Sequence, residues 1–295
     1  MLSQAEEHYT VVGDTFAEAS NALGYDLWAL VSQGPEDQLT LTEFTQPAIL
    51  TASVALYRCW QQEGGPSPEF VAGHSLGEYS ALVCAGALQF QDAVRIVHAR
   101  GQFMQSAVPA GTGKMAAIVG LENQQINEIC DEAEEQQTVS AANFNSPGQT
   151  VIAGNAEAVD RAIALCKEAG AKRALPLNVS VPSHCELMRP AAKQLSDMLD
   201  SVAFNAPQIG VVQNVNAEIA TDPQQIKANL IKQLYAPVLW VDCVQVMHKA
   251  GLDKIVECGP GRVLCGLIKR IESALQCCGS DDLGALESAR AEVTG

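Results

Sequence analysis

The chain has 295 residues, 47% of them hydrophobic, and can bury the core of one large domain or two modest ones. Its formal net charge of −16 argues against non-specific binding to nucleic acid or to anionic membranes. No apolar run reaches the roughly 18 residues of a transmembrane helix, and residues 1–7 lack the basic and apolar regions of a secretory signal. We therefore expect a cytoplasmic protein with no nucleic-acid or membrane partner.

The ten cysteines are scattered without a C-x-x-C pair, and none of the five histidines stands at zinc-finger spacing from two cysteines. In a reducing compartment we expect small core or surface thiols, with the adjacent Cys277 and Cys278 open to oxidation in vitro. The sequence therefore predicts neither a metal site nor a bound cofactor.

Helices dominate the first part of the chain. Residues 1–33 have a helical pattern without a strand. A second helix begins near 45–50, with Pro47 in its first turn, and ends before Gly64 and Gly65.

A Gly-x-Ser-x-Gly pentad follows the first convincing strand, 69–73, and precedes an Ala- and Leu-rich helical pattern. This context of strand, sharp turn and helix presents a serine nucleophile. The glycines allow the tight turn, and the first N–H groups of the helix point at an oxyanion formed on the serine. The alternative is a glycine-rich turn whose serine only caps the helix. The pentad comprises Gly73, His74, Ser75, Leu76 and Gly77.

The next helix, from about 89 to 106, carries a charge on its apolar face. Arginine stands where an apolar residue is expected, because one side of the helix is formed by Ala93, Val97, Arg100 and Met104. An unpaired buried charge is strongly unfavourable, so the guanidinium needs an anion. That anion is either a carboxylate of the protein or a substrate carboxylate held by two hydrogen bonds.

Residues 110–181 have a different pattern, of short strands with helices between them. Their order, β-α-β-β-α-β, is ferredoxin-like, with a turn signal at Asn145–Gly148. The strands are expected at 114–120, 139–143, 150–154 and 173–179, and the helices at 122–136 and 155–169.

Alternating helices and strands resume after this region, up to a last fifteen or so residues that we expect to form a loose tail. The sequence therefore predicts an α/β protein in which a small α+β subdomain, 110–181, is inserted into a larger α/β domain, 1–109 and 182–295. In the last part, helices are expected at about 185–202, from Asp222 as N-cap with Pro223 in the first turn, at about 240–250 and after Gly259–Gly261, and strands at 209–215 and 254–258.

A serine nucleophile needs a base, and the chain offers five histidines. His184 is the strongest candidate because it stands at a loop-to-helix junction at the exit from the small subdomain, although it could also only start a helix. His74 adjoins the serine, but a neighbour in a sharp turn usually points away. Surface or packing positions are expected for His8, His98 and His248.

Together these residues resemble the malonyl-CoA:acyl-carrier-protein transacylases of bacterial type II fatty acid synthesis, over nearly the whole chain. Several separate motifs in the same order make the resemblance far more specific than the pentad alone. It implies an α/β-hydrolase-like large domain with a parallel sheet and an inserted ferredoxin-like subdomain. The motifs are Gly73–Leu82, Arg100–Gly101, Asn143–Gln149, Ser180–His184, Gln233–Val238 and Glu257–Gly261.

The resemblance also implies roles for individual residues. Ser75 is the acyl nucleophile, His184 is its base, and Gln233 orients His184 through a carbonyl. The N–H of Leu76 is one oxyanion donor, and Arg100 binds the free carboxylate of malonyl. The implied substrate pocket also includes Asn143, His74 and Met104.

The implied reaction is ping-pong transfer of malonyl from CoA, through Ser75, to the phosphopantetheine thiol of an acyl carrier protein. The resemblance to this family also favours a monomer. Two rival functions remain open: a serine thioesterase or esterase, for which we assign no triad acid, and a non-catalytic carrier-binding protein. For docking an acidic carrier, the candidates are two basic doublets, Lys172-Arg173 and Lys269-Arg270.

The resemblance has one departure, at the start of the chain. The family opens with a strand and a Gly-Gln-Gly-Ser-Gln loop that supplies a glutamine near the oxyanion, whereas this chain begins in what would be the following helix. Loss of one oxyanion donor typically lowers kcat by about 10²–10³-fold. We therefore expect an N-terminally truncated version or a misassigned start, and the carrier-binding alternative depends on that loss.

Overall fold

The structure is a computed structural model that describes residues 2–179, 181–281 and 283–294. Ser180, the first residue of one of the motifs above, lies outside the described residues. The helices are α1 (Ser3–His8), α2 (Thr10–Leu23), α3 (Leu27–Gln33), α4 (Glu36–Leu39), α5 (Thr42–Gln62), α6 (Gly77–Cys84), α7 (Phe90–Ala107), α8 (Asn123–Glu134), α9 (Ala156–Glu168), the 3-10 helix η1 (Glu186–Met188), α10 (Arg189–Leu199), α11 (Pro223–Gln233), α12 (Trp240–Lys249), α13 (Val263–Ile271) and α14 (Leu283–Thr294).

Short strands alternate with these helices, and the predicted α/β fold class is confirmed. None of the described helices is long and apolar enough to cross a membrane. The strands are β1 (Phe70–Ala72), β2 (Gly113–Val119), β3 (Val139–Ser146), β4 (Gln149–Asn155), β5 (Arg173–Pro176), β6 (Gly210–Val212), β7 (Ile219–Ala220), β8 (Lys254–Glu257) and β9 (Gln276–Gly279).

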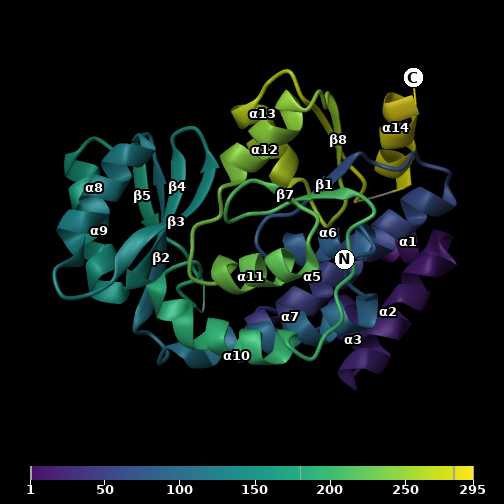
Figure 1. Ribbon diagram of the computed structural model, residues 1–295, viewed down its shortest axis with the longest axis horizontal. Coiled ribbons are helices and arrows are strands. Elements are labelled where there is room, and N and C mark those ends of the chain that lie inside the picture. Colours follow the sequence, from purple (N-terminus) through teal and green to yellow (C-terminus); the bar gives the residue numbers. More distant parts are fainter. Residues whose placement is uncertain (1, 180, 282, 295) are drawn as a thin grey trace.

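The small subdomain, teal in Figure 1, has the ferredoxin-like arrangement. Its antiparallel strands lie in the order β3-β4-β2-β5, and α8 and α9 pack on the sheet through a core of their own. Gly148, with a φ of 67°, lies in the turn between β3 and β4, a left-handed conformation that glycine adopts without strain. The edge strand β5 then leads the chain toward His184, so the subdomain positions the loop that carries this histidine.

The larger part is built mainly of helices around short strands (Figure 1). β1 and β6 pair in parallel, β7 joins β6 antiparallel, and β8 and β9 form a separate parallel pair. The expected strand 209–215 is shorter than predicted because the chain turns at Gln213, whose N–H bonds the Glu218 carbonyl at 3.0 Å. The main apolar core lies among α2, α5, α6, α7 and α10.

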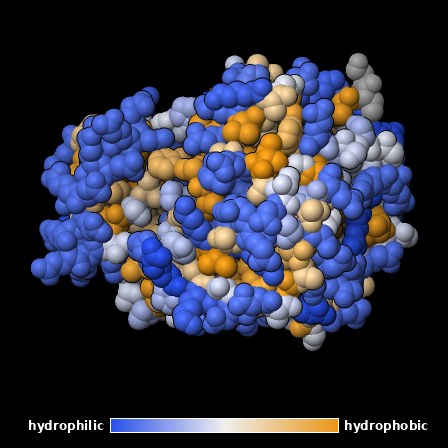
Figure 2. Space-filling view, viewed as in Figure 1, coloured by the Kyte–Doolittle hydropathy of each residue, from blue (hydrophilic) through white to orange (hydrophobic). Residues whose placement is uncertain are grey.

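The hydropathy of the surface also differs between the small subdomain and the larger part. Figure 2 shows a mostly hydrophilic face over α8 and α9, whereas hydrophobic side chains gather over α12 and α13. Among the described residues, the large apolar side chains that are well exposed include three on or just after the edge strand β5: Leu175, Leu177 and Val179.

The prediction of a loose C-terminal tail is wrong, because α14 packs onto the body. Leu286 and Ala289 are 2% and 0% exposed. The guanidinium of Arg290 donates to the carbonyl of Glu63 at 2.6 Å and to its carboxylate at 3.0 Å. The segment is rich in good helix formers, Ala, Leu, Glu and Arg, and its small, polar composition hid the two apolar residues on one face. The strands β7 and β9 were also not predicted.

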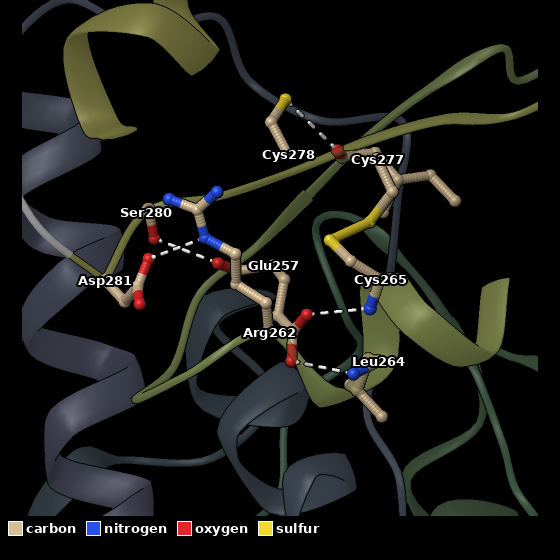
Figure 3. Close-up of a disulfide and its surroundings, with 9 residues drawn as sticks. Glu257, Arg262, Leu264, Cys265, Cys277, Cys278, Ser280 and Asp281 are labelled. Atoms are coloured by element: carbon tan, nitrogen blue, oxygen red, sulfur yellow. Dashed lines mark hydrogen bonds and ion pairs between the residues drawn. A yellow bond between two sulfur atoms is a disulfide. The ribbon is translucent and has the colours of Figure 1, made fainter. Parts of the chain in front are cut away.

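Two of the ten cysteines are paired, against the general expectation of thiols, and one of the two is Cys277, which we expected to be open to oxidation. Cys265 in α13 and Cys277 in β9 form a disulfide with their Cα atoms 5.3 Å apart, and the other eight cysteines are free. Figure 3 shows this disulfide beside the carboxylate of Glu257, which accepts from the N–H groups of Leu264 at 2.9 Å and Cys265 at 2.8 Å. The pairing could not be seen in the sequence because an unpredicted strand brings Cys277 to the helix.

Helices α5 and α7 approach closely at Gly101, the residue after Arg100. Pro47 lies inside α5, not in its first turn, and has no N–H to donate to the carbonyl of Glu43. The ring Nδ1 of His98 bonds that carbonyl at 2.9 Å instead, so His98 is a packing residue, as predicted. A Cβ on Gly101 would stand 2.6 Å from the nitrogen of Glu43, so only glycine allows this approach.

Substitution of Gly101 by Ala should therefore push α7 away from α5 and lower the free energy of unfolding by about 1–3 kcal/mol. Gly266 in α13 is the matched control, because a Cβ there meets nothing within 4 Å. Gly266→Ala should raise the free energy of unfolding by about 0.4–1 kcal/mol, through the lower entropy of the unfolded chain. Urea unfolding measures both, and equal effects of the two substitutions would contradict the close contact at Gly101.

Candidate active site

The serine lies in a sharp turn between β1 and α6. Ser75 has a φ of 52°, the strained left-handed conformation expected of a nucleophile between a strand and a helix. Its N–H donates to Oδ1 of Asn214 at 2.7 Å, and Nδ2 of Asn214 donates to the carbonyl of Gly73 at 2.8 Å. A Cβ on Gly73 would collide with the backbone of Gly77, which is why the turn needs glycine there.

His184 faces the serine from a loop after the small subdomain. Its Nε2 lies 2.8 Å from Oγ of Ser75, and its Nδ1 lies 2.7 Å from the backbone carbonyl of Gln233. A carbonyl only accepts, so Nδ1 carries the ring proton and Nε2 is free to accept the serine proton. The N–H of His184 donates to the carbonyl of Leu234 at 3.0 Å, which holds the histidine backbone, with its φ of 63°, against the end of α11.

The imidazole is held in its neutral form. Burial, together with the positive charge of Arg100, lowers the pKa of His184 to about 3, although the hydrogen bond to Gln233 opposes the change. At neutral pH the ring is therefore an unprotonated acceptor positioned on a hydroxyl, which is the arrangement of a general base.

Arg100 points its guanidinium at the same hydroxyl and is 1% exposed. Nη1 donates to Oε1 of Gln46 at 2.7 Å, and Nη2 donates to Oε1 of Gln233 at 3.0 Å and to Oγ of Ser75 at 3.3 Å. Nε has no partner, and no carboxylate of the described residues forms an ion pair with this side chain. Met104, one turn further along α7, accepts from Nε2 of Gln46 at 3.6 Å through its sulfur. The buried cation thus keeps open capacity for an anion.

The N–H of Leu76 is also available. Leu76 directly precedes α6, and among the described residues its N–H donates no hydrogen bond. A cavity of about 800 Å³ between β1 and β8 adjoins the turn; Leu76 lines it, whereas Ser75, His184 and Arg100 do not. An oxygen atom bound to the reacting carbon would meet this N–H and the N-terminal end of α6.

Two of the predicted pocket residues point elsewhere. Nε2 of His74 lies 2.8 Å from Oδ1 of Asn145, and its ring packs against Trp240 with 5.6 Å between centroids. Asn143 is buried on β3, where it forms an isolated bridge with Val238. Neither residue hydrogen-bonds to Ser75 in the described part of the chain. His74 joins the serine turn to the small subdomain, and Asn143 joins the small subdomain to the segment at Val238.

The sequence reasoning missed several polar residues around the serine. Asn214, Glu78 and Gln46 are buried and bonded to the groups described above. Asn214 stands just beyond β6, the parallel neighbour of β1, and polar residues at the carboxyl ends of neighbouring parallel strands are a recognisable signal. Glu78 stands within the motif Gly73–Leu82, and a charged residue in an otherwise apolar stretch was a signal as well.

A strained serine, a neutral histidine and a buried arginine without an ion-pair partner among the described residues are the groups that a serine-dependent acyltransferase needs. The profile of the acyl transferase domain family matches residues 10–276 of the chain. The chain is 57% identical to the malonyl CoA-acyl carrier protein transacylase of Escherichia coli (strain K12) over 98% of its own length and 94% of that protein, and 46% identical to that of Bacillus subtilis (strain 168) over 93% and 86%.

Solved structures agree with this similarity. The acyl carrier protein S-malonyltransferase of Vibrio cholerae is 57% identical and superimposes with a TM-score of 0.96, over 98% of the chain and 94% of that structure. A malonyl-transacylase solved in complex with a type II PKS acyl-carrier protein is 53% identical, with a TM-score of 0.98, over 99% and 94%. The chain therefore belongs to the family of malonyl CoA-acyl carrier protein transacylases.

The low pKa of His184 predicts how Ser75 reacts as the pH changes. The base is active when unprotonated. With a pKa of about 3, the rate of Ser75 labelling should therefore not change between pH 8 and pH 5. An imidazole with an ordinary pKa near 6.5 would lose about 30-fold over the same range. The measurement is the rate at which a fluorophosphonate labels Ser75, followed by mass spectrometry, with His184→Ala as the control. A 30-fold fall at pH 5 would contradict the lowered pKa.

Proposed function

We propose that the chain transfers a malonyl group from CoA to the phosphopantetheine thiol of an acyl carrier protein, by a ping-pong mechanism through malonyl-Ser75. The observation that carries the proposal is the hydrogen bond between Ser75 and a neutral His184, formed beside the unpaired guanidinium of Arg100. The family assignment and the names of the relatives support the same donor and acceptor.

In the first half-reaction, Oγ of Ser75 attacks the thioester carbonyl carbon while Nε2 of His184 takes the hydroxyl proton. The N–H of Leu76 donates to the oxyanion of the tetrahedral intermediate. The carbon–sulfur bond then breaks, and the CoA sulfur leaves with the proton from His184. In the second half-reaction the carrier thiol gives its proton to Nε2, attacks the malonyl ester, and Oγ of Ser75 leaves and recovers the proton.

Arg100 determines which acyl group is preferred. The free carboxylate of malonyl would occupy the open side of the guanidinium, including the unpaired Nε, in a two-bond contact. Acetyl has no such group and would leave the buried charge unmatched. Gln233 acts twice in this scheme, because its backbone orients His184 and its side chain holds Arg100. We assign Met104 to the pocket wall, and His74 and Asn143 to contacts between the small subdomain and the larger part of the chain.

The rival thioesterase or esterase function finds less support. In the usual triad a carboxylate accepts from Nδ1 of the histidine, whereas here Nδ1 meets the backbone carbonyl of Gln233. A thiolate leaves readily, so this weaker arrangement is sufficient for exchange between thioesters. A general thioesterase or esterase would also have no obvious use for the carboxylate-binding side chain of Arg100.

The two basic doublets are proposed as the carrier-docking surface. Both lie on the surface, the first before and on β5 and the second in the last turn of α13. Arg173, Val119 and Gln149 are aligned across three neighbouring strands, and Arg270 donates to Oε1 of Gln149 at 2.7 Å. The doublets therefore lie near the same end of the strands of the small subdomain, where an acidic partner would meet both.

We further propose that the protein works as a cytoplasmic monomer. The groups around Ser75 all come from one chain, so the site needs no second copy.

The function is tested by incubation with labelled malonyl-CoA and, separately, labelled acetyl-CoA. Wild-type protein should acquire malonyl on Ser75 and release it to a carrier thiol much faster than to water. Arg100→Ala should lose about 10²-fold or more in malonyl labelling, because an uncompensated carboxylate then enters a buried site, while some acetyl labelling persists.

Ser75→Ala is the control that should take no label from either donor. Equal malonyl and acetyl discrimination in wild-type protein and Arg100→Ala would remove the arginine from its role. Absence of any label on wild-type Ser75 would favour the non-catalytic carrier-binding reading, and release mainly to water would favour a thioesterase.

Reversal of the charges in both doublets, to Glu, should slow malonyl transfer to the carrier by about 10-fold, with little effect on labelling by malonyl-CoA. Exposed charges at an interface mainly change the association rate, so the loss should shrink as salt is raised. Lys193 in α10 and Arg95 in α7 are exposed, on helices that lie apart from β5 and α13 (Figure 1), and their reversal is the charge control. An equal loss in both half-reactions would refute the docking proposal.

A further inference from the structure

A buried carboxylate lies behind the serine turn without a cation of its own. Glu78, in the first turn of α6, is 0% exposed. Its Oε1 accepts from Nε2 of Gln213 at 3.0 Å, and its Oε2 accepts from the N–H of Asn214 at 3.0 Å and from Nε2 of Gln233 at 2.9 Å. The mechanism above does not use this group, and a buried charge is retained only where its surroundings compensate it.

The hydrogen-bond partners of Glu78 favour the ionised form. Burial has the larger effect and raises the pKa of Glu78 above its ordinary value, while the three hydrogen bonds and the charge of Arg100 oppose that rise. Each described partner of the carboxylate is an N–H donor, and a protonated carboxyl would need an acceptor that this arrangement does not offer. Glu78 is therefore treated as an anion.

The side-chain amide of Gln233 connects this anion to the cation. Its Nε2 donates to Glu78, and its Oε1 accepts from Nη2 of Arg100 at 3.0 Å. The opposite amide orientation would set an NH₂ against the guanidinium and a carbonyl against the carboxylate. The pair of charges thus fixes one orientation of Gln233, whose backbone carbonyl holds Nδ1 of His184.

A second branch reaches the nucleophile. The N–H of Asn214 donates to Glu78, and Oδ1 of Asn214 accepts from the N–H of Ser75. One carboxylate therefore contacts both residues that hold the serine and the histidine in place. The carboxylate acts on Ser75 and His184 only through these two residues, because it contacts neither Ser75 nor His184 directly.

We propose that Glu78 is the positioning residue of this site, acting through Gln233 and Asn214. It compensates the charge of Arg100 across an amide, without occupying the guanidinium face that the malonyl carboxylate needs, and it holds Ser75 and His184 in reacting geometry. The proposal rests on the acyl-transfer function proposed above.

The test is Glu78→Gln, which keeps the shape and removes the charge. A donor NH₂ then meets the donor of Gln213 or of Gln233, so the serine and histidine lose their fixed geometry. We expect kcat for malonyl labelling of Ser75 to fall by about 10- to 100-fold, the cost of a small misplacement of reacting groups. Glu257→Gln is the matched control, a carboxylate that accepts two backbone N–H bonds at α13 and contacts none of these residues.

A second readout separates charge compensation from a purely structural role. Sodium malonate, compared with sodium acetate at equal ionic strength, should raise the unfolding temperature of Glu78→Gln more than that of wild-type protein. The variant lacks a negative charge near the guanidinium, and the added dianion replaces it. Glu257→Gln should respond to malonate as wild-type protein does.

Both results are required, and a Glu78→Gln protein that matches Glu257→Gln in kcat or in its malonate response would overturn the proposal. If Glu78→Gln does not fold, Glu78→Asp decides. It should keep the wild-type malonate response and lose kcat, and an unchanged kcat would overturn the proposal. Failure of the acyl-transfer function itself is distinct, because wild-type protein would then take no malonyl label at all.

Discussion

Gln233 is the residue on which the geometry of the site depends. Its backbone carbonyl holds the ring of His184, and its side chain bonds Arg100, Glu78 and the carbonyl of Ser75. It is 0% exposed, so water does not compete for these contacts. Nucleophile, base, cation and anion therefore share one neutral partner, at the last residue of α11.

The fold brings this partner and its contacts together from separate units. The turn after β1 carries the serine, α7 carries the arginine, and the return from the small subdomain carries the histidine. Each position is fixed by backbone contacts: Asn214 holds the N–H of Ser75, and the Leu234 carbonyl holds that of His184. The close crossing of α5 and α7 at Gly101 sets the depth of the arginine. The small subdomain thus positions the loop that carries His184, the proposed base.

Much of this arrangement could be predicted from the sequence, because its signals are local. The pentad around Ser75 and the arginine on an apolar stripe depend on turn geometry and helical spacing. Asn214 and Glu78 could not be assigned in this way, since a polar residue shows its partner only after the chain has folded. The same holds for the disulfide of Cys265, which depends on a strand that the sequence pattern did not reveal, and for α14, whose apolar face consists of small or well-spaced residues, Leu286, Ala289 and Val293.

The absence of a carboxylate beside His184 and the isolation of Arg100 are connected. A carboxylate on Nδ1 would raise the pKa of the imidazole and would also lie close enough to attract the guanidinium. The carbonyl of Gln233 orients the ring without adding charge, so the base stays weak and the cation stays unpaired. A weak base is sufficient when the leaving group is a thiolate. For the proposed transfer, the same choice of a neutral orienting group therefore permits exchange between thiols and reserves the buried guanidinium of Arg100 for the substrate carboxylate.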